Sequence, residues 1–331
     1  MKKPKVSIIV PVHNAGKYLV ECLNTLIYQT LQDIEIIIVL DCPTDGSDTI
    51  AVEYAAIDYR IKIIRNRQNM HIGNSRNIGM DNATGEYIGF SDHDDYCALD
   101  MYEKLYTKAK EKDADIVRCN YFKGDKPFIF NADMGQNNIQ LLSQMFNGSV
   151  WNNIYRKDFL TANNIRFADT KITTPEDLLF SVKAYVCTNN IFTITDCLYY
   201  WRVSKNHTST SRNKNVRISY YAGDKLLSML ENMILFLINK GVYDRFSREI
   251  WYFFVIKMYS SVFNGFCKSS QTGFFCWKEI VNKNYFRKEI LKSFKKPYIF
   301  RFYKLKPTNI AFVCLTAIVS IFYGKLHKNA K

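Results

Sequence analysis

A short apolar run that ends in three carboxylates is the feature of this sequence that most restricts its fold. Residues 87–90 have the bulk and β-propensity of a buried strand, and Asp92, Asp94 and Asp95 follow directly. In an open α/β sheet, ligands bind outside the carboxyl ends of the strands. The pattern therefore predicts an acidic site at such an edge.

Three clustered carboxylates repel one another, and burying them is costly unless they are paired or bound to a metal. Asp92 and Asp94 point the same way if the local chain is extended. Hard oxygen ligands at this spacing suit Mg²⁺ or Mn²⁺. The alternative is an acidic turn before a helix that Asp100 caps.

The first 64 residues alternate between strand and helix patterns. Buried strands are expected over residues 6–10, where Pro11 ends the strand, over 34–40 and over 61–64, with helices between them. This order predicts two βαβ units and hence an α/β fold with a nucleotide-binding half-sheet. Neither a G-x-G-x-x-G nor a P-loop motif follows the first strand.

Charge is distributed unevenly along the 331 residues. Residues 1–200 carry 21 Lys and Arg against 25 Asp and Glu, a net charge of −4. Because the whole chain has a net charge of +14, residues 201–331 carry a net charge of +18. The length allows one large α/β domain with an extension, or two domains. The basic part could meet a membrane surface, nucleic acid or a phosphorylated substrate.

Nine cysteines without a C-x-x-C pair indicate reduced thiols, and the apolar run near the N-terminus is too short and too broken for a signal peptide. Together these features predict a cytoplasmic protein.

Five segments in register resemble a family 2 glycosyltransferase of the GT-A fold: residues 6–14, 41–47, 73–79, 83–90 and 92–95. The resemblance implies a mostly parallel central sheet flanked by helices that binds a nucleotide-sugar. By the same resemblance, Pro11, Val12 and Asn14 border the nucleotide base, Asp41 bonds base or ribose, and Arg76 lies near base or diphosphate.

The resemblance also makes Asp92 and Asp94 the Asp-x-Asp pair. Asp92 would reach the ribose or a metal-bound water, and Asp94 would hold Mn²⁺ or Mg²⁺ on the diphosphate. The sequence departs from the family pattern where Leu40 replaces an acid and Cys42-Pro43 replaces Gly-Ser. These departures leave the base and the sugar open.

Two later segments, residues 150–160 and 172–180, also resemble this family, although Asn153 stands where a Lys is common. Asp177 is the candidate base, because inverting transfer needs a carboxylate to take the proton of the acceptor hydroxyl. The competing interpretation is that Glu176 and Asp177 simply open a helix after Pro175.

Arg202 follows an aromatic strand pattern that resembles the end of the catalytic domain, where a mobile loop would bring Arg202 or His207 onto the diphosphate. An ordinary strand followed by a linker fits these residues equally well.

The basic C-terminal part combines aromatic and cationic residues over 286–306, followed by an uncharged apolar run over 310–323. This pattern suits an anionic membrane surface, and the run is shorter than the roughly 20 residues of a spanning helix. A buried helix of a soluble domain is the alternative. Nucleic acid is not expected, because no RNP, KH or helix-turn-helix pattern accompanies the cations.

The sequence thus predicts a GT-A catalytic domain over residues 1–211 and a helical, membrane-associating extension over 212–331. The expected reaction is inverting, metal-dependent sugar transfer from a nucleotide-sugar, with UDP-sugar as the expected donor, to a glycan or lipid-linked acceptor at the inner face of the cell membrane. A nucleotidyltransferase and a non-catalytic binding protein on the same fold are the alternatives.

Overall fold

The computed structural model describes residues 3–130, 149–203 and 223–246. Contacts within the chain divide it into two units, Met1–Ser209 and Thr210–Lys331. The different roles expected for residues 1–211 and 212–331 remain a prediction.

The first unit contains these elements, in chain order: β1 (Val6–Val12), α1 (Tyr18–Ile27), β2 (Ile34–Leu40), α2 (Ser47–Ile57), β3 (Ile61–Arg65), α3 (His71–Asn82), β4 (Tyr87–Phe90), β5 (Tyr96–Cys97), α4 (Met101–Glu111), β6 (Ile116–Lys123), β7 (Lys126–Phe128), β8 (Asn153–Arg156), α6 (Lys157–Ala162), α7 (Glu176–Val186) and β9 (Ile191–Trp201).

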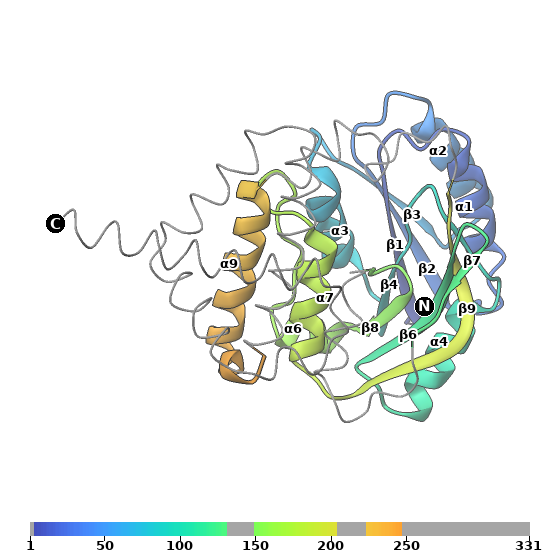
Figure 1. Cartoon of the computed structure of the whole chain (residues 1–331). Coiled ribbons are helices and arrows are strands. Elements are labelled where there is room, and N and C mark those ends of the chain that lie inside the picture. Colours follow the sequence, from blue (N-terminus) through green and yellow to red (C-terminus); the bar gives the residue numbers. More distant parts are fainter. Residues whose placement is uncertain (1–2, 131–148, 204–222, 247–331) are drawn as a thin grey trace. The chain divides into compact units, whose positions relative to one another are not determined.

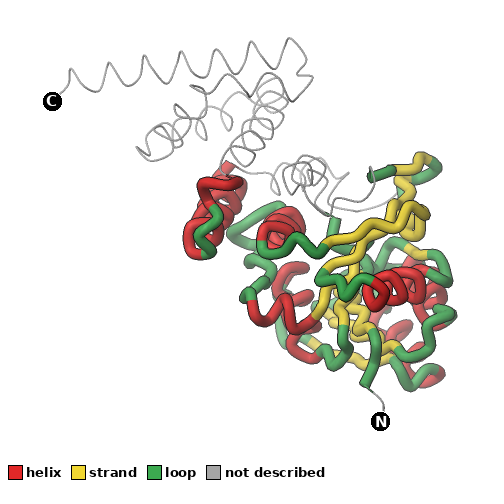
Figure 2. The backbone as a smooth tube through the Cα atoms, turned by 90° about the horizontal axis from the view of Figure 1, so that it is seen from below, coloured by secondary structure: helices red, strands yellow, loops and turns green. Residues whose placement is uncertain are grey.

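One sheet organises this unit, with the strand order β3-β2-β1-β4-β8-β6-β9-β5 and β7 paired to β6. The first four strands of that order are parallel, as the two predicted βαβ units require. Antiparallel pairing begins where β8 joins β4, and β9 returns parallel to β6. The strands form a single layer with helices on both sides (Figure 2).

Helices cover both faces of the sheet. α1, α2 and α4 lie on one face, and α3, α6 and α7 lie on the other (Figure 1). Every residue of β1, β2 and β4 is buried, which is why these strands are nearly continuous apolar runs rather than alternating ones, with Ser7 and Glu35 as buried polar exceptions. The predicted α/β architecture with a helix-flanked sheet is confirmed.

The predicted end of the first strand at Pro11 is wrong, because β1 continues to Val12. The parallel pairing with β4 stops at Ile9, opposite Phe90. The backbone nitrogen of Pro11 faces the same side of β1 as that of Ile9, which is the side of β4. Because the pairing with β4 has already ended, no strand needs an N–H from Pro11. Its carbonyl oxygen instead lies 2.9 Å from Nδ1 of His93. A proline is therefore tolerated inside this buried strand.

In the second unit, the structure describes α9 (Gly223–Asn239) and the residues up to Phe246. One side of α9 is apolar and buried, through Met229, Leu230, Met233, Ile234 and Leu237. Across the described residues, no helix combines the length and the apolar character needed to cross a membrane. The segments 286–306 and 310–323, on which the membrane prediction rests, and His207 lie outside the described residues.

Candidate active site

The site is built on the loops that follow β1, β2 and β4, at the carboxyl edge of the parallel half of the sheet. The first two loops are joined to each other, because Oδ1 of Asn14 accepts a hydrogen bond of 2.7 Å from the Thr44 backbone N–H. Oδ2 of Asp45 likewise accepts one of 2.7 Å from the Gly16 N–H. Asn14, which was predicted to bind the nucleotide-sugar, therefore holds the loop after β1 to the loop after β2.

Asp41 directly follows β2 at the same edge of the sheet. It is 3% exposed, and its Oδ1 accepts hydrogen bonds of 2.7 Å from both Asn66 Nδ2 and the Met70 N–H. Pro11 and Val12 are buried in β1, and the Val12 carbonyl accepts a bond from the Asp41 N–H. The residues predicted to border the base thus form the rigid end of the sheet beside this loop.

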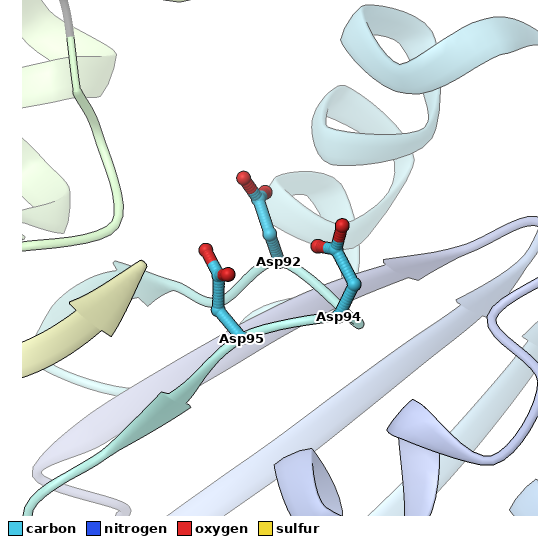
Figure 3. Close-up of side chains that lie close together, drawn as sticks. All are labelled: Asp92, Asp94 and Asp95. Carbon is cyan, nitrogen blue, oxygen red and sulfur yellow. The ribbon is translucent and has the colours of Figure 1, made fainter. Parts of the chain in front are cut away.

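Three carboxylates gather on the loop after β4. Asp92, Asp94 and Asp95 each present an oxygen, and these oxygens lie within 4.8 Å of one another. Figure 3 shows the three side chains projecting to the same side of the loop. Asp92 and Asp94 are partly exposed, whereas Asp95 is only 2% exposed. The side chains of the predicted Asp-x-Asp pair are therefore accessible to solvent, whereas that of Asp95 is buried.

Asp95 anchors this loop to β9. Its Oδ2 accepts a bond of 3.1 Å from the Tyr199 hydroxyl, and its Oδ1 accepts one of 2.8 Å from the Arg202 backbone N–H. The Asp92 N–H in turn donates to the Tyr199 hydroxyl at 3.1 Å. With both of its oxygens engaged, Asp95 serves as the anchor of the loop. That Asp92 and Asp94 hold a cation stays a prediction.

The carboxylate set fits a divalent cation. Burial, followed by the negative charges of Asp94 and Asp92, raises the pKa of Asp95 well above its usual range. The raised pKa of Asp95 reflects repulsion among the three acids, and a cation such as Mg²⁺ or Mn²⁺ held by the hard oxygens of Asp92 and Asp94 would relieve that repulsion.

Arg202 contacts the acidic loop directly. Its Nε donates to the Asp94 carbonyl at 2.9 Å, and its terminal nitrogen forms an ion pair with Glu21. The guanidinium also lies 5.1 Å from the ring centre of Tyr18 and 5.0 Å from that of Tyr96. These contacts hold the loop in place. A contact between Arg202 and the diphosphate stays a prediction.

Arg76 is the central cation of the site. It comes from α3, is 2% exposed, and forms two ion pairs through separate nitrogens. One terminal nitrogen lies 2.8 Å from Asp92 Oδ1 and the other 3.1 Å from Glu176 Oε1. Burial opposes the charge, but the carboxylates of Asp92, Glu176 and Asp177 outweigh it and raise the pKa of Arg76. The guanidinium thus stays charged between the acidic loop and α7.

Asp177 opens α7 next to Glu176, as the helix-start signal predicted. Burial first, and then the charge of Glu176, raises the pKa of Asp177 to about 8, although Arg76 acts in the opposite direction. A carboxylate with a raised pKa near the operating pH is suited to take a proton. The structure therefore places the predicted base one residue from the ion pair that leads to Asp92.

The segment 150–160, which resembles the family, packs into the core through Trp151 and Asn153. Asn153 is 1% exposed and accepts a hydrogen bond of 2.8 Å from the Tyr185 hydroxyl. Trp151 stacks on Tyr199 with ring centres 4.2 Å apart. The Asn that replaces the expected Lys thus lies in the core, where a single cation would be hard to bury.

Sequence reasoning missed the joining contacts, not the acids themselves. Glu176 was predicted as a helix opener within the family-like segment 172–180, and Tyr199 as part of an aromatic strand, but neither was given a role in the site, and Glu21 was not predicted. An acid beside the candidate base was the one available signal for Glu176. Nothing in the sequence pairs Glu21 with a residue 181 positions away.

Comparison with known proteins now adds to this geometry. The model of the family described as glycosyl transferase family 2 matches residues 7–185. The glycosyltransferase EpsJ of Bacillus subtilis is 34% identical over 61% of this chain and 62% of its own length, which is less than two thirds of that protein. The B. subtilis relative EpsH is 31% identical over 77% of this chain and 76% of its length.

The third relative is TarS of Staphylococcus aureus, named poly(ribitol-phosphate) beta-N-acetylglucosaminyltransferase, which is 28% identical over 61% of this chain and 36% of its own length. A crystal structure of TarS residues 1–349 in complex with UDP-GlcNAc superimposes with a TM-score of 0.73 at 22% identity, covering 96% of this chain and 89% of that one. The fold is shared. Because the family model covers more than half of the sequence, the chain belongs to glycosyl transferase family 2.

Proposed function

We propose that the chain moves a sugar from a UDP-sugar to a hydroxyl group of a glycan or lipid-linked acceptor, with inversion at the anomeric carbon. The observation that carries this proposal is the joining of Asp92 and Glu176 through Arg76. It brings the cation-binding loop and the start of α7, which bears Asp177, to one place. Donor activation and proton removal need to occur at the same point of the molecule.

The residues divide the reaction between them. Asp177 takes the proton as the acceptor oxygen attacks the anomeric carbon, the new glycosidic bond forms, and the bond to the diphosphate breaks, so that UDP leaves with the electron pair. Asp92 and Asp94 would hold a divalent cation, which when bound neutralises charge on the leaving diphosphate. Pro11, Val12, Asn14 and Asp41 would border the nucleoside at the end of the sheet.

The relatives support the donor and the stereochemistry. TarS is named as a beta-N-acetylglucosaminyltransferase and has been crystallised with UDP-GlcNAc. A β-linkage made from an α-linked UDP-sugar requires inversion, and a single base such as Asp177 is sufficient for that. TarS carries a polymer, poly(ribitol-phosphate), in its name, which supports our proposal that this chain acts in surface-polysaccharide assembly.

The test uses the purified full chain and a panel of nucleotide-sugars, with Mn²⁺ and with a chelator. We expect slow release of UDP from one UDP-sugar, only when the cation is present. Asp177→Asn is expected to keep UDP binding and lose transfer, and Asp158→Asn, an exposed acid in the first turn of α6, serves as the control. Failure to bind any nucleotide under either condition would favour a non-catalytic binding protein instead.

We further propose that residues 212–331 associate with the anionic inner face of the cell membrane. The support is the net charge of +18 over residues 201–331 together with the aromatic residues among those cations. In vesicle sedimentation at moderate salt, the full chain should pellet with phosphatidylglycerol vesicles and stay in the supernatant with phosphatidylcholine vesicles. Equal behaviour with both vesicle types would contradict an electrostatic contact.

A further inference from the structure

The buried connection between the acidic loop and α7 carries an inference beyond the list of substrate-binding groups. Resting on the proposed function, we infer that Arg76 and Glu176 are positioning residues, and that the ion-pair chain Asp92–Arg76–Glu176 fixes the base Asp177 relative to the donor. Neither residue needs to touch the acceptor for this role.

The geometry of Arg76 is that of a fork between two separate elements. Its two terminal nitrogens each take one carboxylate, at 2.8 Å to Asp92 and 3.1 Å to Glu176. The partners lie 16 and 100 residues away in the sequence. The side chains of Arg76 and Glu176 are each 3% exposed, and that of Asp92 is 25% exposed. A planar guanidinium with both ends occupied sets the separation of its two partners.

The helix that carries Arg76 is itself held firmly. Asn77 exchanges two hydrogen bonds with Phe167, at 2.9 and 3.0 Å, and the Gly73 N–H donates to Thr170 Oγ1 at 3.0 Å. The ring of Phe167 lies 5.1 Å from the Arg76 guanidinium carbon. The segment that leads into α7 is therefore docked on α3, and the ion pair of Arg76 with Glu176 extends this docking to the first residue of α7.

A purely stabilising role does not account for this choice of residues. A buried ion pair rarely stabilises a fold more than apolar side chains of the same volume would. Here one guanidinium serves a cation-loop acid and the neighbour of the base, so its placement governs the distance between the two reacting partners. A displacement of about 1 Å at such a point can cost on the order of 100-fold in rate.

The first test compares three variants of the full chain: Glu176→Gln, Arg76→Lys and the control Arg166→Lys. Arg166 also reaches from the segment before α7 to α3, where both of its terminal nitrogens bind the exposed carboxylate of Asp81. Its variant therefore removes a two-pronged arginine contact with α3 outside the ion-pair chain. Sugar release or transfer gives kcat and KM, and calorimetry with UDP and Mn²⁺ gives the affinity for the nucleotide.

Glu176→Gln is expected to lower kcat by on the order of 100-fold while the UDP affinity stays within about threefold, because Glu176 does not belong to the acidic loop. Arg76→Lys keeps the positive charge but cannot span both acids, so it is expected to lose kcat as well. Arg166→Lys should resemble the wild type. Wild-type kcat in both site variants, or a loss that disappears at temperatures where the variants are fully folded, would overturn the inference.

A second test does not depend on activity. The Tm of Asp92→Asn, Glu176→Gln and the double variant forms a double-mutant cycle. Because both acids share Arg76, we expect the shift of the double variant to differ from the sum of the single shifts. Additive shifts would overturn the inference even in an inactive protein. Clear coupling in a protein that transfers no sugar would instead count against the proposed function alone.

Discussion

Replacing Asp177 by Asn should make the protein more stable while it removes the base. The folded structure raises the pKa of Asp177 from 3.8 to about 8, through burial first and the charge of Glu176 next. Between these two pH values the folded protein holds a proton that the unfolded chain has released. Stability contributed at this position is therefore fully present below about pH 4 and is lost as the pH rises towards 8.

The size of the effect follows from the width of that interval. One pKa unit corresponds to about 1.4 kcal/mol, and about three units separate 3.8 from pH 7, which gives an upper limit of about 4 kcal/mol. The Asp177 side chain is only partly buried, so contact with solvent reduces the free-energy cost of its charge. We expect Asp177→Asn to gain about 1–3 kcal/mol at pH 7, which is roughly 2–10 °C in Tm for a unit of this size.

The assay is thermal unfolding of the full chain at pH 4.5, 6, 7 and 8, without added metal. The gain from Asp177→Asn should be small at the lowest pH and grow with pH. Asp158→Asn removes an exposed acid from the first turn of another helix and should change Tm little, because it loses only a helix-dipole interaction of about 0.3–1 kcal/mol. An unchanged or lower Tm of Asp177→Asn at pH 7 would refute the reasoning that the site holds this carboxylate at a cost.

Three further outcomes are expected. Asp94→Asn should raise the Mn²⁺ concentration needed for half-maximal activity at least tenfold, measured by metal titration of transfer. Tyr199→Phe removes the hydroxyl that joins Asp92 and Asp95, and should lower Tm by a few degrees for a loss of about 1–2 kcal/mol, with weaker metal activation in the same titration. Gly73→Ala would place its Cβ 2.3 Å from the Ala168 carbonyl oxygen, and should cost about 1–3 kcal/mol in urea unfolding.

The parallel half of the sheet could be predicted from sequence because its signals are local. Residues 34–40 were predicted as a strand, and β2 occupies those residues because a strand buried on both faces is a nearly continuous apolar run, interrupted here by Glu35 alone. The start of α7 at Glu176 was equally visible from the preceding Pro175. Pro11 misled the prediction because its tolerance depends on where the neighbouring strand ends, which is not written near it in the chain.

The acids of the site could be predicted, but their connections could not. Asp92 and Asp94 show themselves by spacing at the end of a strand. Whether Arg76 meets a donor or a second carboxylate depends on a residue 100 positions later, brought close by the docking of the segment before α7. Cys42 illustrates the same limit: it stands where the family resemblance has Gly, and only the backbone shows that it adopts a φ of 52°, in the left-handed region that favours glycine.

The balance of charge at the site predicts that binding of the donor diphosphate depends on a divalent cation. Around the carboxyl edge, the described residues supply five carboxyl groups and two guanidinium groups: Asp92, Asp94, Asp95, Glu176, Asp177, Arg76 and Arg202. Even with Asp95 and Asp177 protonated, Asp92, Asp94 and Glu176 outnumber the two guanidinium groups. Both guanidinium groups are already paired with acids, Arg202 with Glu21 outside this set. A diphosphate that approached alone would meet net negative charge and be repelled. Donor affinity should therefore depend steeply on the divalent cation, whereas raising the salt concentration cannot substitute for it, because general screening supplies no ligand for Asp94.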